Sequence, residues 1–376
     1  MIMSEKIYTA SLVGCGRIGY SLGLDSKREQ PASHTMALNA NPRIRLEAGC
    51  DVDSDSLSMW HDANPDAEVF SSSEEMYARV HSDIVVIAVN EDSHKKEALA
   101  AISSRPRLVI LEKPVALNMS EAFEILDAAK KSSVPVLVNH ERRFAADYLM
   151  AADLLGKIGD VQSVNGFLNS GMAVYSQREE KTGAYSLIHD GTHLADAVLF
   201  FLERLEGKSE SGIKKISRKK KGGLLEMASW FSLGQKYVSD ILNTPVLTGI
   251  FLDDKGCVRQ VCAHYSTAKC PDVNLSFSGR SRYFGFGIEI IGTEGKICVG
   301  NGFLKFYRRE ESSLYSGFYS LVRQDDVRPP KKTGYFSNMV QGAVDFLDSK
   351  TDLRSSLQTG INALAVLEEI RKELRR

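Results

Sequence analysis

The sequence predicts an α/β protein with two domains, the first built on a doubly wound parallel sheet and the second on a mostly antiparallel sheet. The chain has 376 residues, and domains average about 150 residues, so two are expected. Short apolar strands alternate with helical stretches as far as residue 144, which is the pattern of βαβ units. From residue 145 onward, longer strand-like stretches follow one another and indicate an antiparallel sheet. We therefore expect domains at residues 1–144 and 145–376.

The strands predicted in the first domain are near-continuous runs of Val, Ile and Leu. Such runs are typical of parallel strands that are buried on both faces. They are Ile7–Val13, Ile44–Cys50, Ile84–Val89, Leu108–Leu111 and Val134–Asn139. A helix is predicted to start at Asn118, because Glu121 three residues later completes a pattern like a capping box, and apolar residues then recur at helical spacing.

The second domain is predicted to contain a series of strands, several of them separated by Gly and Asp turns. They are Val161–Asn169, Leu224–Leu233, Tyr237–Leu242, Thr248–Leu252, Asn274–Ser278, Phe286–Ile291 and Phe303–Tyr307. Two helices close the chain, and each has one apolar stripe that we expect to face the core. The stripes run from Phe336 to Leu347 and from Leu357 to Leu374. These helices can pack back across the domain boundary.

The composition excludes several classes of protein. With 43% hydrophobic and 25% charged residues, the chain matches an ordinary globular protein rather than a disordered, coiled-coil or fibrous one. Its net charge of −1 gives no reason to expect a nucleic-acid partner. No apolar run approaches the roughly 20 residues that cross a bilayer, and the N-terminus lacks the apolar segment of a signal peptide, so we expect a cytoplasmic protein without a membrane partner. The six cysteines lack zinc-ligand spacing, and we expect no metal site.

A glycine-rich loop follows the first predicted strand directly, and a helix is expected to open from it. Gly14 permits the tight turn, Gly16 lets the backbone approach a pyrophosphate, and Gly19 permits close packing of helix on strand. The first N–H groups of the helix, near Arg17 and Ile18, would bind the phosphate oxygens. This context favours a dinucleotide-binding site.

An acidic pair follows the second predicted strand. Asp51 comes first, so we expect its carboxylate to accept hydrogen bonds from the ribose hydroxyls of the cofactor, with Asp53 as the alternative. No Lys or Arg follows closely, and a carboxylate repels a 2′-phosphate, which favours NAD over NADP. The gap from Gly14 to Asp51 exceeds the usual ~20 residues, and a polar insertion at Tyr20–Ser33, expected to be a solvated loop, accounts for it. Both acids could instead be ordinary turn residues.

Further motifs occur in order along nearly the whole chain. They are the Gly14–Gly19 loop, His34, Asp51, His94, Glu112-Lys113-Pro114, Arg142-Arg143-Phe144, Gly156-Lys157-Ile158-Gly159, Asp190-Gly191-Thr192-His193 with Asp196, and Gly292-Thr293-Glu294-Gly295. With these motifs the chain resembles the Gfo/Idh/MocA oxidoreductases, the family of glucose–fructose oxidoreductase and inositol dehydrogenase. The resemblance implies an N-terminal Rossmann domain and a C-terminal α/β domain whose open, mostly antiparallel sheet often forms subunit interfaces, hence a homodimer or homotetramer. It also implies NAD(P)-dependent hydride transfer between the nicotinamide and a secondary alcohol or ketone of a sugar, sugar nucleotide or inositol.

Lys113 and His193 match the catalytic lysine and histidine of that family. A lysine beside the nicotinamide can hydrogen-bond the reacting oxygen and stabilise alkoxide charge, and a histidine with a pKa of about 6.5 suits proton transfer near neutrality. Many relatives place an Asp four residues before the histidine, where this chain has His189, whereas Asp190 lies three residues before it. Either residue could be the third catalytic group, because both separations lie on one helix face.

Other candidates for the cofactor site follow later strands of the first domain. Asn90 and His94 come after the third predicted strand, at the edge of the sheet where ligands bind. His94 is either a cofactor contact or a structural cap. Glu112 is expected to orient Lys113, and the bond between Lys113 and Pro114 can be cis.

The leading functional hypothesis is therefore an NAD-dependent dehydrogenase that acts on a sugar-type small molecule. Two alternatives remain open. The first is an NAD-dependent glycosidase of the same fold, a chemistry found in some relatives. The second is a non-catalytic regulator that senses NAD or a sugar, and the presence of both Lys113 and His193 argues against it.

Overall fold

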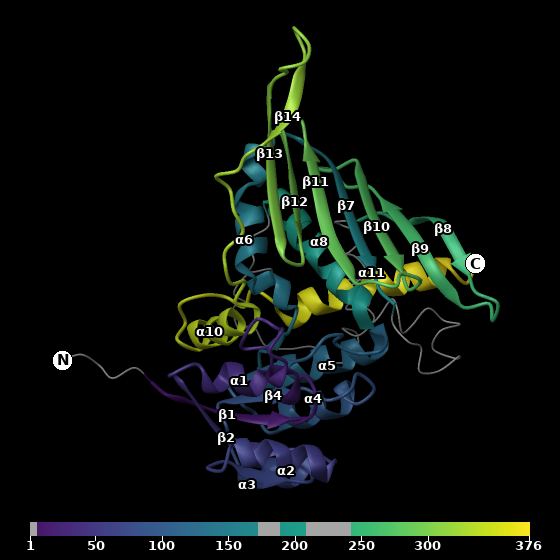
Figure 1. The fold of residues 1–376 in the computed structure, drawn as a ribbon. Helices are drawn as coiled ribbons and strands as arrows, with labels where there is room; N and C mark the ends of the chain where they lie inside the picture. Colours follow the sequence, from purple (N-terminus) through teal and green to yellow (C-terminus); the bar gives the residue numbers. More distant parts are fainter. Residues whose placement is uncertain (1–5, 172–188, 208–241) are drawn as a thin grey trace. The chain divides into compact units, whose positions relative to one another are not determined.

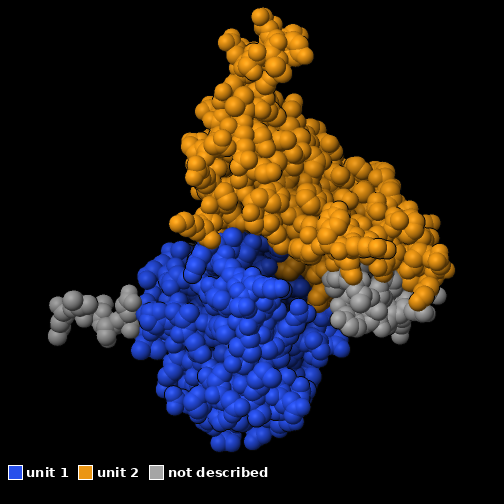
Figure 2. All heavy atoms as spheres, in the orientation of Figure 1, with its two compact units in different colours: residues 1–145, 332–361 blue, residues 146–331, 362–376 orange. Residues whose placement is uncertain are grey.

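The computed structural model describes residues 6–171, 189–207 and 242–376. The chain folds into two compact units, coloured separately in Figure 2: residues 1–145 with 332–361, and residues 146–331 with 362–376. Each unit has its own sheet, and Figure 1 shows the elements of both. Among the described residues, no helix combines the length and the apolar character that crossing a membrane requires.

The first unit is built around a six-stranded sheet with the order β3-β2-β1-β4-β5-β6. All neighbouring strands are parallel, and the order reverses between β1 and β4, as in a doubly wound fold. The strands are β1 (Tyr8–Val13), β2 (Ile44–Cys50), β3 (Glu68–Phe70), β4 (Ile84–Ile87), β5 (Leu108–Leu111) and β6 (Val136–Val138). Every strand predicted for this domain is present, which confirms the parallel sheet. Strand β3 was not predicted, because its three residues are too few to show a periodic pattern.

The helices of the first unit follow these strands and end with one from the C-terminal part of the chain. They are α1 (His34–Asn39), α2 (Ser54–Ala63), α3 (Ser73–Arg79), α4 (His94–Ser103), α5 (Met119–Ser132) and α10 (Tyr335–Leu347), with the short 3-10 helices η1 (Ser21–Leu24) and η2 (Glu141–Phe144). Helix α5 begins as predicted. Asn118 Oδ1 accepts a hydrogen bond from the N–H of Glu121 at 3.0 Å, and Glu121 Oε2 accepts one from the N–H of Leu117 at 3.3 Å.

The insertion at Tyr20–Ser33 differs from what the sequence analysis expected. The glycine loop does not open directly into an α-helix: turns and η1 follow it, and α1 begins only at His34, where the Ser33 side chain caps it. The Glu29 carboxylate accepts hydrogen bonds from the N–H of Thr333 at 2.8 Å and of Gly334 at 2.6 Å. Because Gly334 is the N-cap of α10, this carboxylate lies at the positive end of that helix. The insertion is therefore tied to the body of the first unit rather than freely solvated.

Helix α10 supplies part of the core of the first unit. The stripe predicted on it is buried there, together with side chains of β1, β4 and β5, through Phe336, Met339, Val340, Ala343 and Leu347. Burial of such a stripe stabilises the unit by removing apolar surface from water. This segment, residues 332–361, thus folds with the N-terminal part of the chain.

The second unit contains an eight-stranded sheet with the order β14-β13-β12-β11-β7-β10-β9-β8. Its neighbours are antiparallel except β7 and β10, which are parallel. The strands are β7 (Val161–Asn169), β8 (Val246–Leu252), β9 (Val258–Tyr265), β10 (Asp272–Ser278), β11 (Gly285–Gly292), β12 (Gly295–Gly300), β13 (Phe303–Glu311) and β14 (Tyr319–Arg323). The mostly antiparallel sheet is confirmed, although β9, β12 and β14 were missed. The strand predicted at Leu224–Leu233, and all of Tyr237–Leu242 but its last residue, lie outside the described residues.

Helices cover one face of this second sheet. They are α6 (Ala146–Asp153), α8 (Gly191–Leu205) and α11 (Leu357–Glu373), with η3 (Leu155–Lys157), and Figure 1 shows α8 and α11 running behind the strands. Helix α8 approaches β7 closely at Gly166, where a Cβ would lie 2.9 Å from Leu194 and 3.0 Å from Val198. This contact fixes α8 on the sheet, and with it the residues at its N-terminus.

Candidate active site

The glycine loop has the shape that a dinucleotide site needs. Gly14 has a φ of +98°, and a Cβ there would lie 2.5 Å from the carbonyl oxygen of Ala88. A Cβ on Gly19 would lie 1.9 Å from the carbonyl oxygen of Gly14. At Gly16, by contrast, a Cβ would have no neighbour within 4 Å. The protein's own packing therefore requires the first and third glycines, whereas the second leaves open space of the kind that phosphates occupy.

A single helical turn follows Gly16 in this loop. The N–H groups of Tyr20 and Ser21 both donate to the carbonyl oxygen of Gly16, at 2.8 and 3.2 Å. The first N–H groups of such a turn, here those of Arg17 and Ile18, have no acceptor inside the turn and suit an anion. The Arg17 side chain is exposed.

Asp51 and Asp53 have different surroundings. Asp51 Oδ2 accepts a hydrogen bond from the N–H of Cys15 at 2.7 Å, so its carboxylate lies against the glycine loop. Asp53 is the N-cap of α2 and accepts from the N–H of Asp55 at 3.1 Å and the hydroxyl of Ser56 at 2.8 Å. A carboxylate has about four acceptor positions, so half-buried Asp51 keeps capacity for ribose hydroxyls. The geometry thus favours Asp51, and Asp53 serves its helix.

A buried polar network holds the backbone at Lys113. Glu112 Oε1 lies 2.7 Å from His34 Nε2 and accepts a hydrogen bond from Asn139 Nδ2 at 2.6 Å, while Oε2 accepts one from the N–H of Lys113 at 3.2 Å. Burial alone would raise the pKa of Glu112, but the hydrogen bond and charge of His34, the charge of Lys113 and the Asn139 amide hold that pKa well below its usual range. Glu112 is therefore an anion fixed beneath the half-buried Lys113, whose bond to Pro114 is cis.

The sequence analysis assigned no role to His34 or Asn139 in this network. Asn139 follows β6 directly, at the edge of the sheet where β5 also ends. The carboxyl ends of parallel strands meet at one edge, so an amide at this position could have been recognised as a neighbour of Glu112. His34 lies 78 residues before Glu112, and no local pattern joins them.

His94 serves the same turn from the other side. Its Nδ1 lies 2.6 Å from the carbonyl oxygen of Pro114 and its Nε2 lies 3.1 Å from that of Val89. The ring is 1% exposed, and burial lowers its pKa, so it is neutral at pH 7. Both nitrogens face backbone carbonyls, which favours the structural alternative for His94. Asn90, in the same loop, is exposed.

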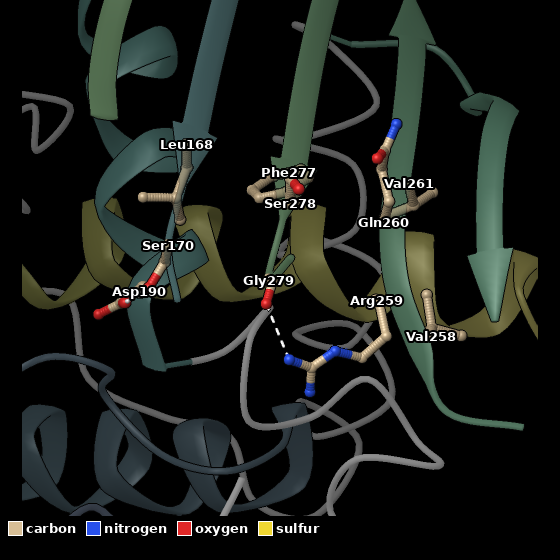
Figure 3. Close-up of a pocket in the computed structure, with 10 residues that line it drawn as sticks. All are labelled: Leu168, Ser170, Asp190, Val258, Arg259, Gln260, Val261, Phe277, Ser278 and Gly279. Atoms are coloured by element: carbon tan, nitrogen blue, oxygen red, sulfur yellow. Dashed lines mark hydrogen bonds between the residues drawn. The ribbon is translucent and has the colours of Figure 1, made fainter. Parts of the chain in front are cut away.

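The remaining candidates lie at the start of α8 in the second unit. Asp190 is the N-cap residue of this helix, and its Oδ2 lies 3.4 Å from the Ser170 hydroxyl. His193 is half-buried in the first turn, and Asp196, one turn on, is 1% exposed. Asp190 lines a hollow formed by the ends of β7 and β10 and the start of β9, with Leu168, Ser170, Val258, Arg259, Gln260, Val261, Phe277, Ser278 and Gly279 (Figure 3). Neither His189 nor His193 is among these described lining residues, so of the three candidates the hollow contains Asp190.

Comparison with known protein families identifies the first unit. Residues 9–140 match the model of the Gfo/Idh/MocA oxidoreductases, described as an oxidoreductase family with an NAD-binding Rossmann fold. The N-terminal domain of this chain belongs to the Gfo/Idh/MocA family. The match covers the first unit, where it indicates the NAD-binding Rossmann domain of an oxidoreductase. Among the described residues, no group of His, Cys, Asp and Glu side chains is placed to hold a metal ion.

Individual oxidoreductases and dehydrogenases align with the chain at low identity. An uncharacterised oxidoreductase of Schizosaccharomyces pombe is 24% identical over 283 residues, which are 72% of this chain and 70% of the relative. The scyllo-inositol 2-dehydrogenase (NADP(+)) IolW of Bacillus subtilis is 28% identical over 141 residues, 36% of this chain and 39% of that protein. The crystal structure of the WlbA dehydrogenase from Bordetella pertussis, in complex with NADH and UDP-GlcNAcA, matches with a TM-score of 0.69 and 15% identity over 100% of this chain and 97% of that one. Such a structural match shows a shared fold.

Proposed function

We propose that this protein is an NAD-dependent dehydrogenase that transfers a hydride between the nicotinamide and a secondary alcohol or ketone of a sugar, a sugar nucleotide or inositol. The observation that carries this proposal is the buried Glu112–His34–Asn139 network, which fixes the backbone of Lys113 at the end of β5. A buried, fully engaged carboxylate is costly to maintain unless its position matters. The scyllo-inositol 2-dehydrogenase among the relatives adds support for the substrate class.

The glycine loop and Asp51 fit NAD. The open space at Gly16 would receive the pyrophosphate, with the N–H groups of Arg17 and Ile18 as donors. Asp51, hydrogen-bonded to the loop through the N–H of Cys15, would accept the ribose hydroxyls. Its negative charge would repel the 2′-phosphate of NADP, so we propose a preference for NAD. When bound, the nicotinamide supplies the hydride acceptor or donor.

The protein's own side chains manage the hydroxyl proton. The Lys113 ammonium hydrogen-bonds the reacting oxygen and stabilises the charge that develops on it. The His193 imidazole takes or returns the proton. Asp190 accepts a hydrogen bond from a neighbouring hydroxyl of the substrate and orients the ring, a role that its place in the hollow favours over His189. His94, Glu112, His34 and Asn139 act as positioning residues for the turn that carries Lys113.

The lysine provides the direct test. Replacing Lys113 with Met removes the ammonium while keeping most of the apolar stem, so we expect kcat to fall by about 10²–10⁴-fold while NAD binding persists. The measurement is stopped-flow absorbance at 340 nm with the substrate found by screening sugars, inositols and sugar nucleotides, together with calorimetric titration of NAD.

A matched variant guards against a general effect of removing charge. Lys131 is exposed on α5, which is not part of the open sheet of the second unit, and Lys131→Met should turn over at the wild-type rate. Wild-type turnover in Lys113→Met would contradict the proposed role.

We further propose that the protein is a homodimer or homotetramer formed through the open sheet of the second unit, which sedimentation equilibrium of the full chain would test.

A further inference from the structure

A second, wider hollow adjoins the one that contains Asp190. It measures about 600 Å³ and shares three residues with the first hollow, Ser170, Arg259 and Gly279. Its other lining residues are Gly171, Arg280, Ser281, Arg282, Tyr283 and Phe284. Among the lining residues that the structure describes, three are arginines and none is acidic. Since the whole chain has a net charge of −1, this concentration of positive charge is local.

The wall of this hollow is fixed by hydrogen bonds. The Arg259 guanidinium donates to the carbonyl oxygen of Gly279 at 2.8 Å, as Figure 3 shows, and the N–H of Gly279 donates to the carbonyl oxygen of Arg259 at 2.8 Å. This two-bond clamp joins the start of β9 to the segment 279–284, which carries the other two arginines. The Arg280 guanidinium also lies 3.6 Å from the centre of the Phe251 ring. The Arg259–Gly279 end of the wall and the Arg280 side chain are thus positioned before a ligand binds, which lowers the conformational entropy lost there on binding.

The chemistry of the lining selects an anion that is attached to a ring. Arginine binds a carboxylate or a phosphate through two parallel N–H donors. Like charges gathered in a hollow also raise the local concentration of an oppositely charged ligand. Tyr283 and Phe284, which are 66% and 57% exposed, offer apolar faces beside these donors. Such faces suit the C–H surface of a sugar ring, whereas an inorganic anion would not use them.

We propose that this second hollow binds the anionic group of the substrate, so that the protein acts on a sugar carrying a carboxylate or a phosphate rather than on a neutral sugar. The proposal rests on the proposed function, because it takes Asp190 as a group that contacts the reacting part of the substrate. The two hollows share Ser170, Arg259 and Gly279 in their linings, so an anionic group bound in the second lies near Asp190.

Binding measurements on the full-length protein saturated with NADH test the proposal. The probes are matched sets of the gluco, galacto and manno series: the neutral sugar, its uronic acid and its 6-phosphate. We expect at least one anionic probe to bind 10-fold or more tightly than its neutral counterpart. Comparison of the uronic acid with the 6-phosphate then shows whether the hollow prefers a carboxylate or a phosphate. If no anionic probe exceeds its neutral counterpart, or if inorganic phosphate binds as tightly as the best sugar, the proposal is wrong.

Variants of the arginines assign the effect to this hollow. Arg280→Gln with Arg282→Gln should abolish the 10-fold preference while leaving the Kd for NADH and for the neutral sugar unchanged. Arg308→Gln, an exposed arginine on β13, is the matched control and should keep the preference. An unchanged preference in the double variant overturns the proposal. The two proposals fail separately: arginine-dependent binding without hydride transfer would refute the proposed function alone, and turnover of an anionic sugar unaffected by the double variant would refute this inference alone.

Discussion

The cofactor end of the first unit and the hollows of the second unit are built in different ways. The cofactor end consists mainly of backbone: a glycine loop, the ends of parallel strands, and a carboxylate that holds the loop. The hollows consist of side chains from strands and a helix terminus that lie far apart in the sequence, such as Ser170, Asp190 and Arg259. A backbone site can keep one shape for one cofactor, whereas a side-chain site can change its ligand by substitution. This contrast explains why a single fold serves many substrates.

Substitutions of the loop glycines have the largest expected effect, and they test the claim that backbone shapes the cofactor site. In Gly19→Ala the new Cβ would lie 1.9 Å from a backbone oxygen that cannot move cheaply, so we expect a loss of about 3 kcal/mol or more in the free energy of unfolding. In Gly16→Ala the Cβ meets nothing, so stability should change by no more than about 0.5 kcal/mol. The same methyl group would fill the phosphate space and weaken NAD binding by about 10-fold or more. Urea denaturation and calorimetry measure the two quantities.

The results for Gly16→Ala and Gly19→Ala can contradict the view that the cofactor site is shaped by backbone. If Gly16→Ala bound NAD as tightly as the wild type, the open space there would not be the pyrophosphate site. If Gly19→Ala were as stable as the wild type, the loop would be able to shift, and the view that the backbone alone dictates its shape would fail.

The same contrast explains what could be predicted from the sequence. The parallel strands, the glycine loop and the α5 cap depend on neighbours within a few residues, and the structure has them as predicted, apart from the helix delayed by the insertion at Tyr20–Ser33. The partners of Glu112 could not be predicted in the same way, because His34 and Asn139 meet it only when separate strands and a helix assemble. The arginine hollow was missed for the same reason, since Arg259 and Arg280 become neighbours through the pairing of β9 with β10. Tertiary contacts decide such sites, and sequence spacing carries no trace of them.

Variants of the two candidates for the third catalytic group test the claim that side chains build the site of the second unit. Asp190 lines the hollow and His189 does not, so Asp190→Asn should lower kcat/KM by about 100-fold and His189→Asn by less than about threefold. Both variants keep the size of the side chain close to the original, and NAD binding in both should equal that of the wild type. Steady-state kinetics on the identified substrate decide between them. The reverse order of effects would make His189 the third group and would show that lining the hollow does not mark the substrate contact.

The smallest expected effect concerns His94, which joins the turn at Lys113 to the end of β4. Burial lowers its pKa below the ordinary 6.5, so the folded state keeps the ring neutral while the unfolded chain takes up a proton as the pH falls through 6.5. The unfolded state then binds more protons, and stability falls on acidification from about pH 6.5 down to the folded-state pKa, with a slope of at most about 1.4 kcal/mol per pH unit from this group. His94→Gln should be less stable at pH 7, because it loses the hydrogen bond that the single N–H of the neutral ring donates to one of the two carbonyl oxygens, but should show a shallower slope below pH 6.5. His81→Gln, on an exposed histidine, is the matched control and should keep the wild-type slope in urea denaturation from pH 5 to 8. Equal slopes for the wild type and His94→Gln would mean that the ring is charged between its two carbonyls, and that the turn carrying Lys113 is held by an imidazolium ion.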